Sequence, residues 1–244
     1  MIITSLDNKK IKELSKLKQK KQRDLTNKFI VEGEHLIQEA LKANLLEEII
    51  IMEGYDTDIY SNKTFVTKEV MNKLTDLDTP CSMIGICNKK NTNTITGNKI
   101  LLLDDIQDPG NLGTIIRSGL AFNVDTIILS KNTVDLYNPK VIRSTQGMLF
   151  HINIITMELT EAIEEIHKNN ILVYATDVVD GTDVRTLSKN EKEKYALVMR
   201  NEGNGVSQTV KSLCGKNLYI KMNEKTESLN VAIATSILLY ELGD

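Results

Sequence analysis

Short hydrophobic runs and periodic polar stretches alternate along the first ninety residues. Ile11, Leu14 and Leu17 recur every three residues among lysines, which predicts an amphipathic helix at the start of the chain. Further on, runs of strand length alternate with helical periods, and we expect strands at 29–31, 48–52, 65–66 and 82–87 and helices at 34–43 and 68–74.

The pattern becomes more regular from residue 100 onward. Hydrophobic runs without polar alternation are separated by helical stretches, which is typical of a parallel sheet covered on both faces. The polar stretch 88–94 has no hydrophobic period and predicts a linker. The sequence therefore predicts two α/β domains, residues 1–90 and 98–244. The expected strands of the second are 100–103, 126–129, 172–175, 196–199 and 218–220, and its expected helices are 112–122, 159–168, 206–213 and 229–241.

Composition places the chain among ordinary globular proteins. Of its 244 residues, 41% are hydrophobic and 26% are charged, which argues against disorder. The longest strongly hydrophobic window, 231–240, is too short to cross a bilayer, and the first residues lack the order of a signal peptide. We therefore expect a cytoplasmic protein.

Charge is distributed unevenly, although the net charge is only −3. Residues 1–28 hold nine Lys or Arg and three Asp or Glu, a net charge of +6, and the remainder carries −9. A basic arm of this kind can bind a polyanion, because local charge sets phosphate contacts, or it can be a solvated helix face. Charge alone leaves both interpretations open.

Cysteines and histidines give no sign of a metal site. Cys81, Cys87 and Cys214 contain no CxxC pair, and the three histidines lie far apart in the sequence. We predict free thiols in a reducing compartment and no bound metal.

Two loops that follow predicted strands carry candidate chemistry, because ligands bind at the carboxyl ends of parallel strands. The loop 104–113 leads into a helix, with Asn111 as a good N-cap and Arg117 nearly two turns later. In the loop 223–230, Ser228 is a natural N-cap and Asn230 follows it. A capped helix with an exposed arginine would also explain the loop 104–113, and simple capping would also explain the loop 223–230.

A third loop, residues 200–207, places two glycines directly after a strand. Gly203 and Gly205 resemble a dinucleotide-binding turn, but position 208, where a third glycine would fall, is Gln. A nucleotide- or nicotinamide-binding enzyme remains an alternative, with the incomplete glycine pattern against it.

Taken together, the three loops resemble the motifs of the SpoU (TrmH-like) family of RNA 2′-O-ribose methyltransferases. The matching motifs are Asn111-x-Gly113-x3-Arg117, Asn201-Glu202-Gly203-x-Gly205 and Ile220-x-Met222-x5-Ser228-Leu229-Asn230. Residues 141–150 resemble the stretch that follows the first motif, and Phe29-Ile30-Val31-Glu32-Gly33 resembles the small substrate-binding domain that many members carry. The resemblance covers nearly the whole chain.

The resemblance implies a small α/β RNA-binding domain followed by a parallel-sheet α/β methylase with a deep trefoil knot. It also implies a homodimer through the C-terminal domain, with S-adenosylmethionine as cofactor and RNA, ribosomal more than transfer RNA, as substrate. By motif, the cofactor-binding residues would be Thr176, Arg200, Asn201, Gly205, Ile220, Met222 and Leu229.

One position departs from the family pattern, which usually has Gly where this chain has Arg200. If the loop needs positive φ there, an arginine would be strained. If only the backbone faces the cofactor, the side chain can point away or meet an RNA phosphate. A non-catalytic RNA-binding protein with a spoiled cofactor pocket is the second alternative.

The resemblance assigns the catalytic centre to Arg117, as a general base or as a clamp. A guanidinium holds its proton above roughly pH 12, so we favour a bidentate clamp on the phosphate of the target. Asn111 would hold the loop or Arg117, Glu202 would orient an arginine or the ribose, and Ser228 and Asn230 would bond ribose or phosphate.

Phosphate contacts from the basic region would supply affinity without reading sequence. The candidate RNA-binding residues are Lys9, Lys10, Lys18, Lys20, Lys21, Arg23 and Arg143.

Overall fold

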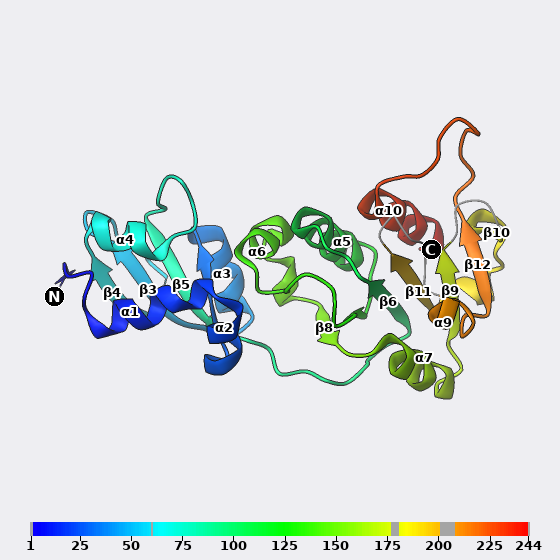
Figure 1. Cartoon of the computed structure of the whole chain (residues 1–244), viewed down its shortest axis with the longest axis horizontal. Helices are drawn as coiled ribbons and strands as arrows, with labels where there is room; N and C mark the ends of the chain where they lie inside the picture. The colour runs from blue at the N-terminus through cyan, green and yellow to red at the C-terminus, as the bar shows by residue number, and fades with distance from the viewer. Residues whose placement is uncertain (1, 60, 177–180, 201–207, 244) are drawn as a thin grey trace. The chain divides into compact units, whose positions relative to one another are not determined.

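The computed structural model describes residues 2–59, 61–176, 181–200 and 208–243 (Figure 1). The chain forms two compact units. Unit 1 comprises residues 1–91 together with 135–150, and unit 2 comprises 92–134 and 151–244. The stretch 135–150, which lies inside the sequence of the predicted second domain, therefore belongs to the first.

Unit 1 is built on a mixed five-stranded sheet in the order β1-β4-β3-β5-β2. Strand β5 is antiparallel to both its neighbours, whereas β1 and β3 run parallel to β4. The strands are β1 (Ile2–Ile3), β2 (Lys28–Glu32), β3 (Leu46–Met52), β4 (Asn62–Val66) and β5 (Met83–Asn88). All four strands predicted for this region are present, and β1, too short to give a pattern, was missed.

The lysine-rich N-terminal segment is an integral part of unit 1. Strand β1 pairs with β4, and the side chains of Ile11 and Leu17 are buried in the core. A hydrophobic residue on every turn, buried against the sheet, explains why this segment is helical despite its charge. The predicted amphipathic helix is confirmed, and the basic segment is part of the domain that was predicted for residues 1–90. The helices of the unit are α1 (Lys9–Ser15), the 3-10 turn η1 (Lys16–Lys18), α2 (Lys20–Thr26), α3 (Glu34–Lys42) and α4 (Lys68–Leu74).

The segment 135–150 packs on unit 1 through aromatic and charged contacts. It contains α6 (Pro139–Thr145) and the 3-10 turn η2 (Met148–Phe150). The ring of buried Phe29 lies 4.6 Å from that of Tyr137 and 6.2 Å from that of Phe150, between centroids. Because these contacts join positions more than a hundred residues apart, no local pattern could have predicted them.

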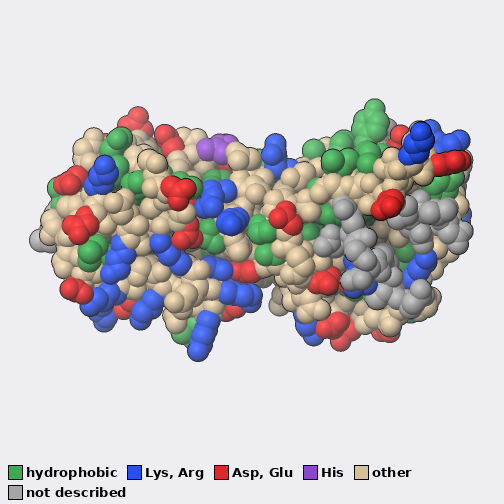
Figure 2. All heavy atoms as spheres, turned by 45° about the horizontal axis from the view of Figure 1, so that its top comes forward, with side chains coloured by type: hydrophobic (Ala, Val, Ile, Leu, Met, Phe, Trp, Pro, Cys, Tyr) green, Lys and Arg blue, Asp and Glu red, His purple; other side chains and the backbone are tan. Residues whose placement is uncertain are grey.

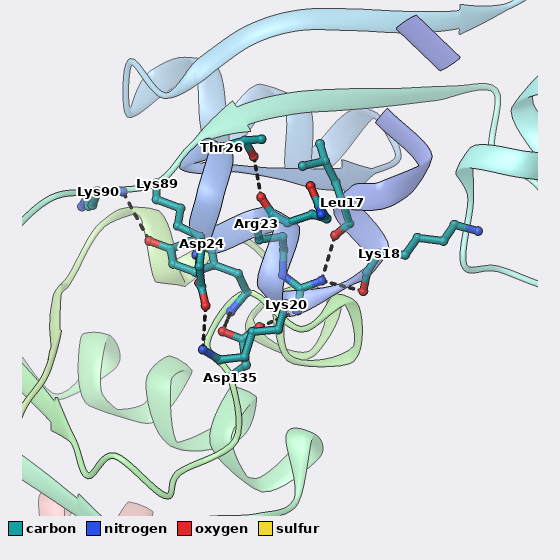
Figure 3. Close-up of polar contacts among 11 residues, drawn as sticks. Leu17, Lys18, Lys20, Arg23, Asp24, Thr26, Lys89, Lys90 and Asp135 are labelled. Atoms are coloured by element: carbon teal, nitrogen blue, oxygen red, sulfur yellow. Dashed lines mark hydrogen bonds and ion pairs between the residues drawn. The ribbon is translucent and has the colours of Figure 1, made fainter. Parts of the chain in front are cut away.

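Arg23 is the centre of the polar contacts that hold this segment (Figure 3). Its side chain is only 4% exposed and donates to the carbonyl oxygens of Leu17 and Lys18, at 2.8 and 2.7 Å. It also pairs with the carboxylate of Asp135 at 2.5 Å. A buried guanidinium with this set of partners has a structural role, so the prediction that Arg23 binds RNA is wrong.

Unit 2 is built on a seven-stranded sheet in the order β10-β12-β9-β11-β6-β7-β8, and every pairing in it is parallel. The predicted parallel sheet is confirmed, but β8 and β10 were missed: β10 has only two residues, and β8 lies at the edge of the sheet with one fully buried residue. The strands are β6 (Lys99–Asp104), β7 (Thr126–Leu129), β8 (Asn153–Thr156), β9 (Leu172–Thr176), β10 (Thr182–Asp183), β11 (Tyr195–Arg200) and β12 (Lys216–Tyr219).

Helices cover both faces of this sheet. On one face, α7 (Leu159–Lys168) and α9 (Gln208–Lys211) close a core with buried Ile100, Ile128 and Val198. On the other face, α5 (Pro109–Ala121) and α10 (Val231–Leu242) pack together (Figure 1), joined by a 2.7 Å hydrogen bond between Ser118 and Ser236. The turn η3 (Val184–Thr186) and helix α8 (Lys189–Glu193) complete the unit.

Much of the predicted linker is anchored. At its start, the backbone N–H of Lys89 bonds Asn27, and the Lys90 ammonium donates to the carbonyl of Phe150 at 2.6 Å. At its end, Asn153 donates to the carbonyl of Thr94 at 2.9 Å. The polar residues at both ends of this stretch therefore make contacts within their own units. The chain passes from one unit to the other here, and again at residues 134–135 and 150–151.

Within the described ranges, no helix combines the length and hydrophobicity needed to cross a membrane. Cys81, Cys87 and Cys214 are free thiols, as predicted.

Replacing Arg23 with Met tests the structural role of this side chain. We expect the free energy of unfolding to fall by roughly 3–5 kcal/mol, because Asp135 and two carbonyl groups lose their buried partner. Urea denaturation of the whole chain measures this. Lys21→Met, at an exposed position of the same helix, is the matched control and should stay within about 0.5 kcal/mol of wild type. Equal stability of the two variants would contradict the assignment.

Candidate active site

Three of the predicted site loops leave the same edge of the seven-stranded sheet. Strands β6 and β11 are parallel neighbours, with Asp104 and Arg200 paired in register as their last residues. Strand β9 ends beside them at Thr176, and β12 ends at Tyr219. Parallel pairing thus brings together positions that are up to a hundred residues apart in the sequence.

The first motif opens α5, but Asn111 is not its cap. The N-cap is Asp108, whose carboxylate accepts a hydrogen bond from the backbone N–H of Asn111 at 2.7 Å. Proline suits the first position of a helix, since its fixed φ is helical and its missing N–H is not needed. The Asp108-Pro109 pair therefore starts the helix earlier than predicted, and Asn111 is its third residue. That pair was the signal in the sequence that could have given the correct start.

The third motif opens α10, and here too the cap differs from the prediction. The side-chain oxygen of Asn230 accepts from the backbone N–H groups of Ala232 and Ile233, at 3.0 and 3.3 Å. Ser228 lies two residues before the cap and is exposed. Ser and Asn cap helices about equally well, so propensity could not decide between them.

One hydrogen bond joins the first and third motifs. The Nδ2 of Asn230 donates to the Oδ1 of Asn111 at 3.0 Å, across 119 positions of sequence. The two helix starts are therefore held side by side, with α5 and α10 continuing in parallel contact through Ser118 and Ser236. The structure brings Asn111 to Asn230, one of the residues predicted to lie with it.

Arg117 lies on the exposed surface of α5. Within the described residues, its guanidinium makes no hydrogen bond or ion pair. A guanidinium has five N–H donors in a planar fork, and no described residue occupies those of Arg117, which suits a bidentate partner.

Arg200 occupies an unstrained strand position. The six described non-glycine residues with positive φ are all Asn, Asp or Gln, and Arg200 is not one of them. Its side chain, 19% exposed, lies 3.6 Å from the carboxylate of Asp104 on the neighbouring strand. The strain expected from an arginine at this position is therefore absent, and the side chain faces a carboxylate of its own sheet.

The other predicted cofactor residues are placed around the same edge. The hydroxyl of Thr176 donates to the carbonyl of Val198 at 3.1 Å, which fixes the end of β9 against β11. Ile220, Met222 and Leu229 lie in the loop that leads from β12 to α10, and all three are half-buried. Half-buried apolar side chains at a strand end suit an apolar and aromatic group such as an adenine ring. Asn201, Glu202 and Gly205 lie outside the described residues.

Most of the predicted RNA-binding lysines are already paired within unit 1. Lys10 pairs with Glu48, Lys18 donates to the carbonyl of Thr75 at 2.6 Å, and Lys20 pairs with Asp24 at 2.8 Å. The Lys20 ammonium, with help from Lys89, holds the pKa of the Asp24 carboxyl below its usual value. The ammonium group of each of these lysines already contacts an internal partner, which weakens its attraction for a polyanion.

Arg143 is also paired, at 3.0 Å from Glu32. Glu32 is only 6% exposed and also accepts from the hydroxyl of Thr75 at 2.7 Å. Lys9 and Lys21, by contrast, are exposed and have no ion-pair partner among the described residues, and the same holds for Lys16. Among the lysines of residues 1–28, these three are the most available to a ligand.

Replacing Arg200 with Met tests the Asp104 pair. The carboxylate of Asp104 is only 14% exposed, so losing the facing charge should lower the free energy of unfolding by about 1–3 kcal/mol. The double variant Asp104→Asn/Arg200→Met removes both charges and should recover part of that loss. Urea denaturation of wild type, Asp104→Asn, Arg200→Met and the double variant measures the effect. Losses that simply add would show that the two side chains do not interact.

Comparison with known proteins assigns both parts of the sequence. Residues 98–240 match the family model described as the SpoU rRNA Methylase family, and residues 8–85 match the one described as the MRM3-like substrate binding domain. The 23S rRNA (guanosine(2553)-2′-O)-methyltransferase RlmP of Bacillus subtilis is 36% identical over 247 residues, which cover 98% of either chain.

Solved structures agree with this assignment. An AdoMet-bound rRNA methyltransferase from Sinorhizobium meliloti is 29% identical, with a TM-score of 0.87 over 99% of this chain and 97% of that one. A putative RNA methyltransferase of the TrmH family from Porphyromonas gingivalis is 27% identical, with a TM-score of 0.88 over 98% of each chain. The family match covers more than half of the chain and includes all three motif loops. The chain therefore belongs to the SpoU rRNA methylase family and is a methyltransferase.

Proposed function

We propose that this methyltransferase transfers a methyl group from S-adenosylmethionine to the 2′-hydroxyl of a ribose in 23S ribosomal RNA. The observation that carries the proposal is the similarity to RlmP over nearly the full length of both chains, motif loops included. The common sheet edge of β6, β9, β11 and β12, where the motif residues gather, supports it.

Several side chains fit the cofactor. Ile220, Met222 and Leu229 would cover its apolar and aromatic parts, and Thr176 fixes the strand end beside them. When bound, S-adenosylmethionine supplies a methyl group on a positively charged sulfur, already activated for attack. The protein's task is then to hold and orient the ribose.

Arg117 is the residue best suited to that task. A guanidinium group is a hydrogen-bond donor with no accepting atom, so the role that suits it is to hold an oxygen of the substrate. Exposed and without a partner among the described residues, Arg117 can hold a phosphate of the target nucleotide through two parallel N–H bonds. Such a clamp fixes the angle of the hydroxyl and favours its deprotonated form.

Arg117→Lys tests the clamp and the substrate together. Lysine keeps the charge but loses the bidentate geometry, so kcat/KM for 23S rRNA should fall at least about tenfold, with unchanged binding of S-adenosylmethionine by calorimetry. The assay uses labelled cofactor and maps 2′-O-methyl sites in 23S rRNA, with transfer RNA in parallel. Arg185→Lys, at another exposed arginine of unit 2, is the control. Wild-type turnover by Arg117→Lys would remove the clamp, and label only in transfer RNA would remove the proposed substrate.

The alternative of a non-catalytic RNA-binding protein depended on Arg200 distorting the cofactor pocket. Arg200 is an ordinary strand residue paired with Asp104, so that argument loses its basis. The alternative of a nucleotide- or nicotinamide-binding enzyme is not supported either, because the chain belongs to a methylase family.

The basic surface of unit 1 is proposed to bind the RNA backbone. Figure 2 shows Lys and Arg side chains gathered over this unit. Lys9 in α1, Lys16 in η1 and Lys21 in α2 are exposed and have no ion-pair partner within the described residues. Lys10, Lys18, Lys20 and Arg143 contribute more weakly to this surface, because each is held by an internal partner.

Replacing Lys9, Lys16 and Lys21 with Gln in one variant tests this surface. RNA affinity should fall, and the slope of log affinity against log salt should decrease by roughly 2, because about 0.7–0.9 of a counterion is released per phosphate contact. Fluorescence titration at several salt concentrations measures both quantities. Lys168→Gln, at an exposed position of unit 2, is the control. An unchanged slope would show that the three lysines are only a solvated face.

Homodimerisation through unit 2 is also proposed. Ile233 and Tyr240 on α10 are 53% and 68% exposed, and with half-buried Ile237 they follow the i, i+4, i+7 spacing of one helix face. Exposed apolar side chains in such a stripe are typical of an interface. The stripe runs along α10, which packs on α5, the helix that carries Arg117, so a partner seated there would lie close to the site.

The trefoil knot is proposed on the order of the strands. The chain leaves β12, second from the edge of the sheet, and α10 starts against Asn111, in the first turn of the helix that follows β6, although β9 and β11 separate β12 from β6 in the sheet. The cytoplasmic location stays a prediction.

A further inference from the structure

The side chain of Asn230 is fixed at both of its ends. Its oxygen accepts from the backbone N–H groups of Ala232 and Ile233, and its nitrogen donates to the oxygen of Asn111 at 3.0 Å. An amide has one accepting and one donating end. Because the helix start requires the accepting end, the end that faces Asn111 must be the donor.

The orientation of the Asn230 amide in turn fixes the orientation of the Asn111 amide. The backbone N–H of Asn111 is held by the carboxylate of Asp108 at 2.7 Å, which places the residue firmly in the first turn of α5. Its side-chain oxygen faces Asn230, so its NH2 group points away from that contact. Within the described residues this NH2 group makes no hydrogen bond, and the side chain is half-exposed.

We infer that Asn230 is a positioning residue that makes Asn111 a hydrogen-bond donor to an oxygen of the RNA backbone. This inference rests on the proposed function and deepens it. The NH2 group of Asn111 binds an acceptor such as a phosphate or ribose oxygen of the substrate strand. It does not accept the proton of the 2′-hydroxyl, because the nitrogen of an amide is a hydrogen-bond donor and not a base.

The two amides therefore form a relay that starts from the backbone of α10. The backbone N–H groups at the start of α10 fix the orientation of the Asn230 amide. The Asn230 amide fixes the orientation of the Asn111 amide, whose NH2 group faces the substrate. If the amide of Asn230 were reversed, the amide of Asn111 would turn as well and present its oxygen to the RNA. The RNA oxygen there is also an acceptor, and two acceptors repel.

Asn230→Asp is the variant that separates positioning from capping. The new carboxylate still accepts from Ala232 and Ile233, so α10 stays capped. It has no donor for Asn111, whose amide should turn to donate its NH2 group and present its oxygen to the RNA. We expect kcat/KM for 23S rRNA to fall about 10- to 100-fold, mainly through KM for RNA. The thermal midpoint and the affinity for S-adenosylmethionine should not change.

Asn230→Ser separates orientation from added charge. Serine caps the helix and is neutral, but its hydroxyl is too short to reach Asn111. The Asn111 amide is then free to rotate, and the loss should be smaller than for Asn230→Asp but still several-fold. Thr226→Asp, at an exposed position of the preceding loop, adds the same charge without touching either asparagine. It should show only a weak effect that disappears at higher salt.

These outcomes distinguish the inference from the proposed function. If wild-type protein methylates no ribose of 23S rRNA, the proposed function is wrong. If wild type is active and Asn230→Asp and Asn230→Ser share its kcat/KM, the inference is overturned. A loss in Asn230→Asp that Thr226→Asp reproduces would also overturn it, because charge alone would then explain the effect.

Discussion

The hydrogen bond between Asn111 and Asn230 is the contact on which the arrangement of the site depends. It joins the first helix of the methylase to its last, at the point where both begin. The side-chain oxygen of Asn230 accepts from a backbone N–H of its own helix, and the backbone N–H of Asn111 donates to the carboxylate of Asp108. The parallel sheet brings the strand ends to one edge, but a sheet does not set the position of a helix that follows β12 after an eleven-residue loop, Ile220 to Asn230. This amide pair, with the Ser118–Ser236 bond further along, supplies that alignment.

Internal pairing changes how the charge of the chain should be interpreted. Residues 1–28 have a net charge of +6, but Arg23 is buried against Asp135, and Lys10, Lys18 and Lys20 are each held by a neighbour. The basic residues of the segment therefore serve two purposes. Some lock the stretch 135–150 onto unit 1, and only the exposed remainder is available to phosphate.

The extent to which the sequence predicted this structure follows from the range of the interactions involved. Hydrophobic runs such as 126–129 predicted their strands well, because burial on both faces of a parallel sheet demands them. Helix starts were displaced, since Asp108 and Asn111, or Ser228 and Asn230, are competing caps a few residues apart. Contacts over more than a hundred positions, Phe29 with Tyr137 or Asn111 with Asn230, leave no local trace. The motif residues could be named from resemblance, but their relation to one another could not.

A double-mutant cycle on Asn111 and Asn230 tests the central claim most directly. If Asn230 acts on the reaction only by orienting Asn111, its substitution should lose its effect once Asn111 has no amide to orient. The measurement compares kcat/KM of Asn111→Ala with that of Asn111→Ala/Asn230→Asp. The account predicts values that agree within about twofold, although Asn230→Asp alone costs at least about tenfold. A double variant whose loss is the product of the two single losses would show that the residues act independently and would contradict the account.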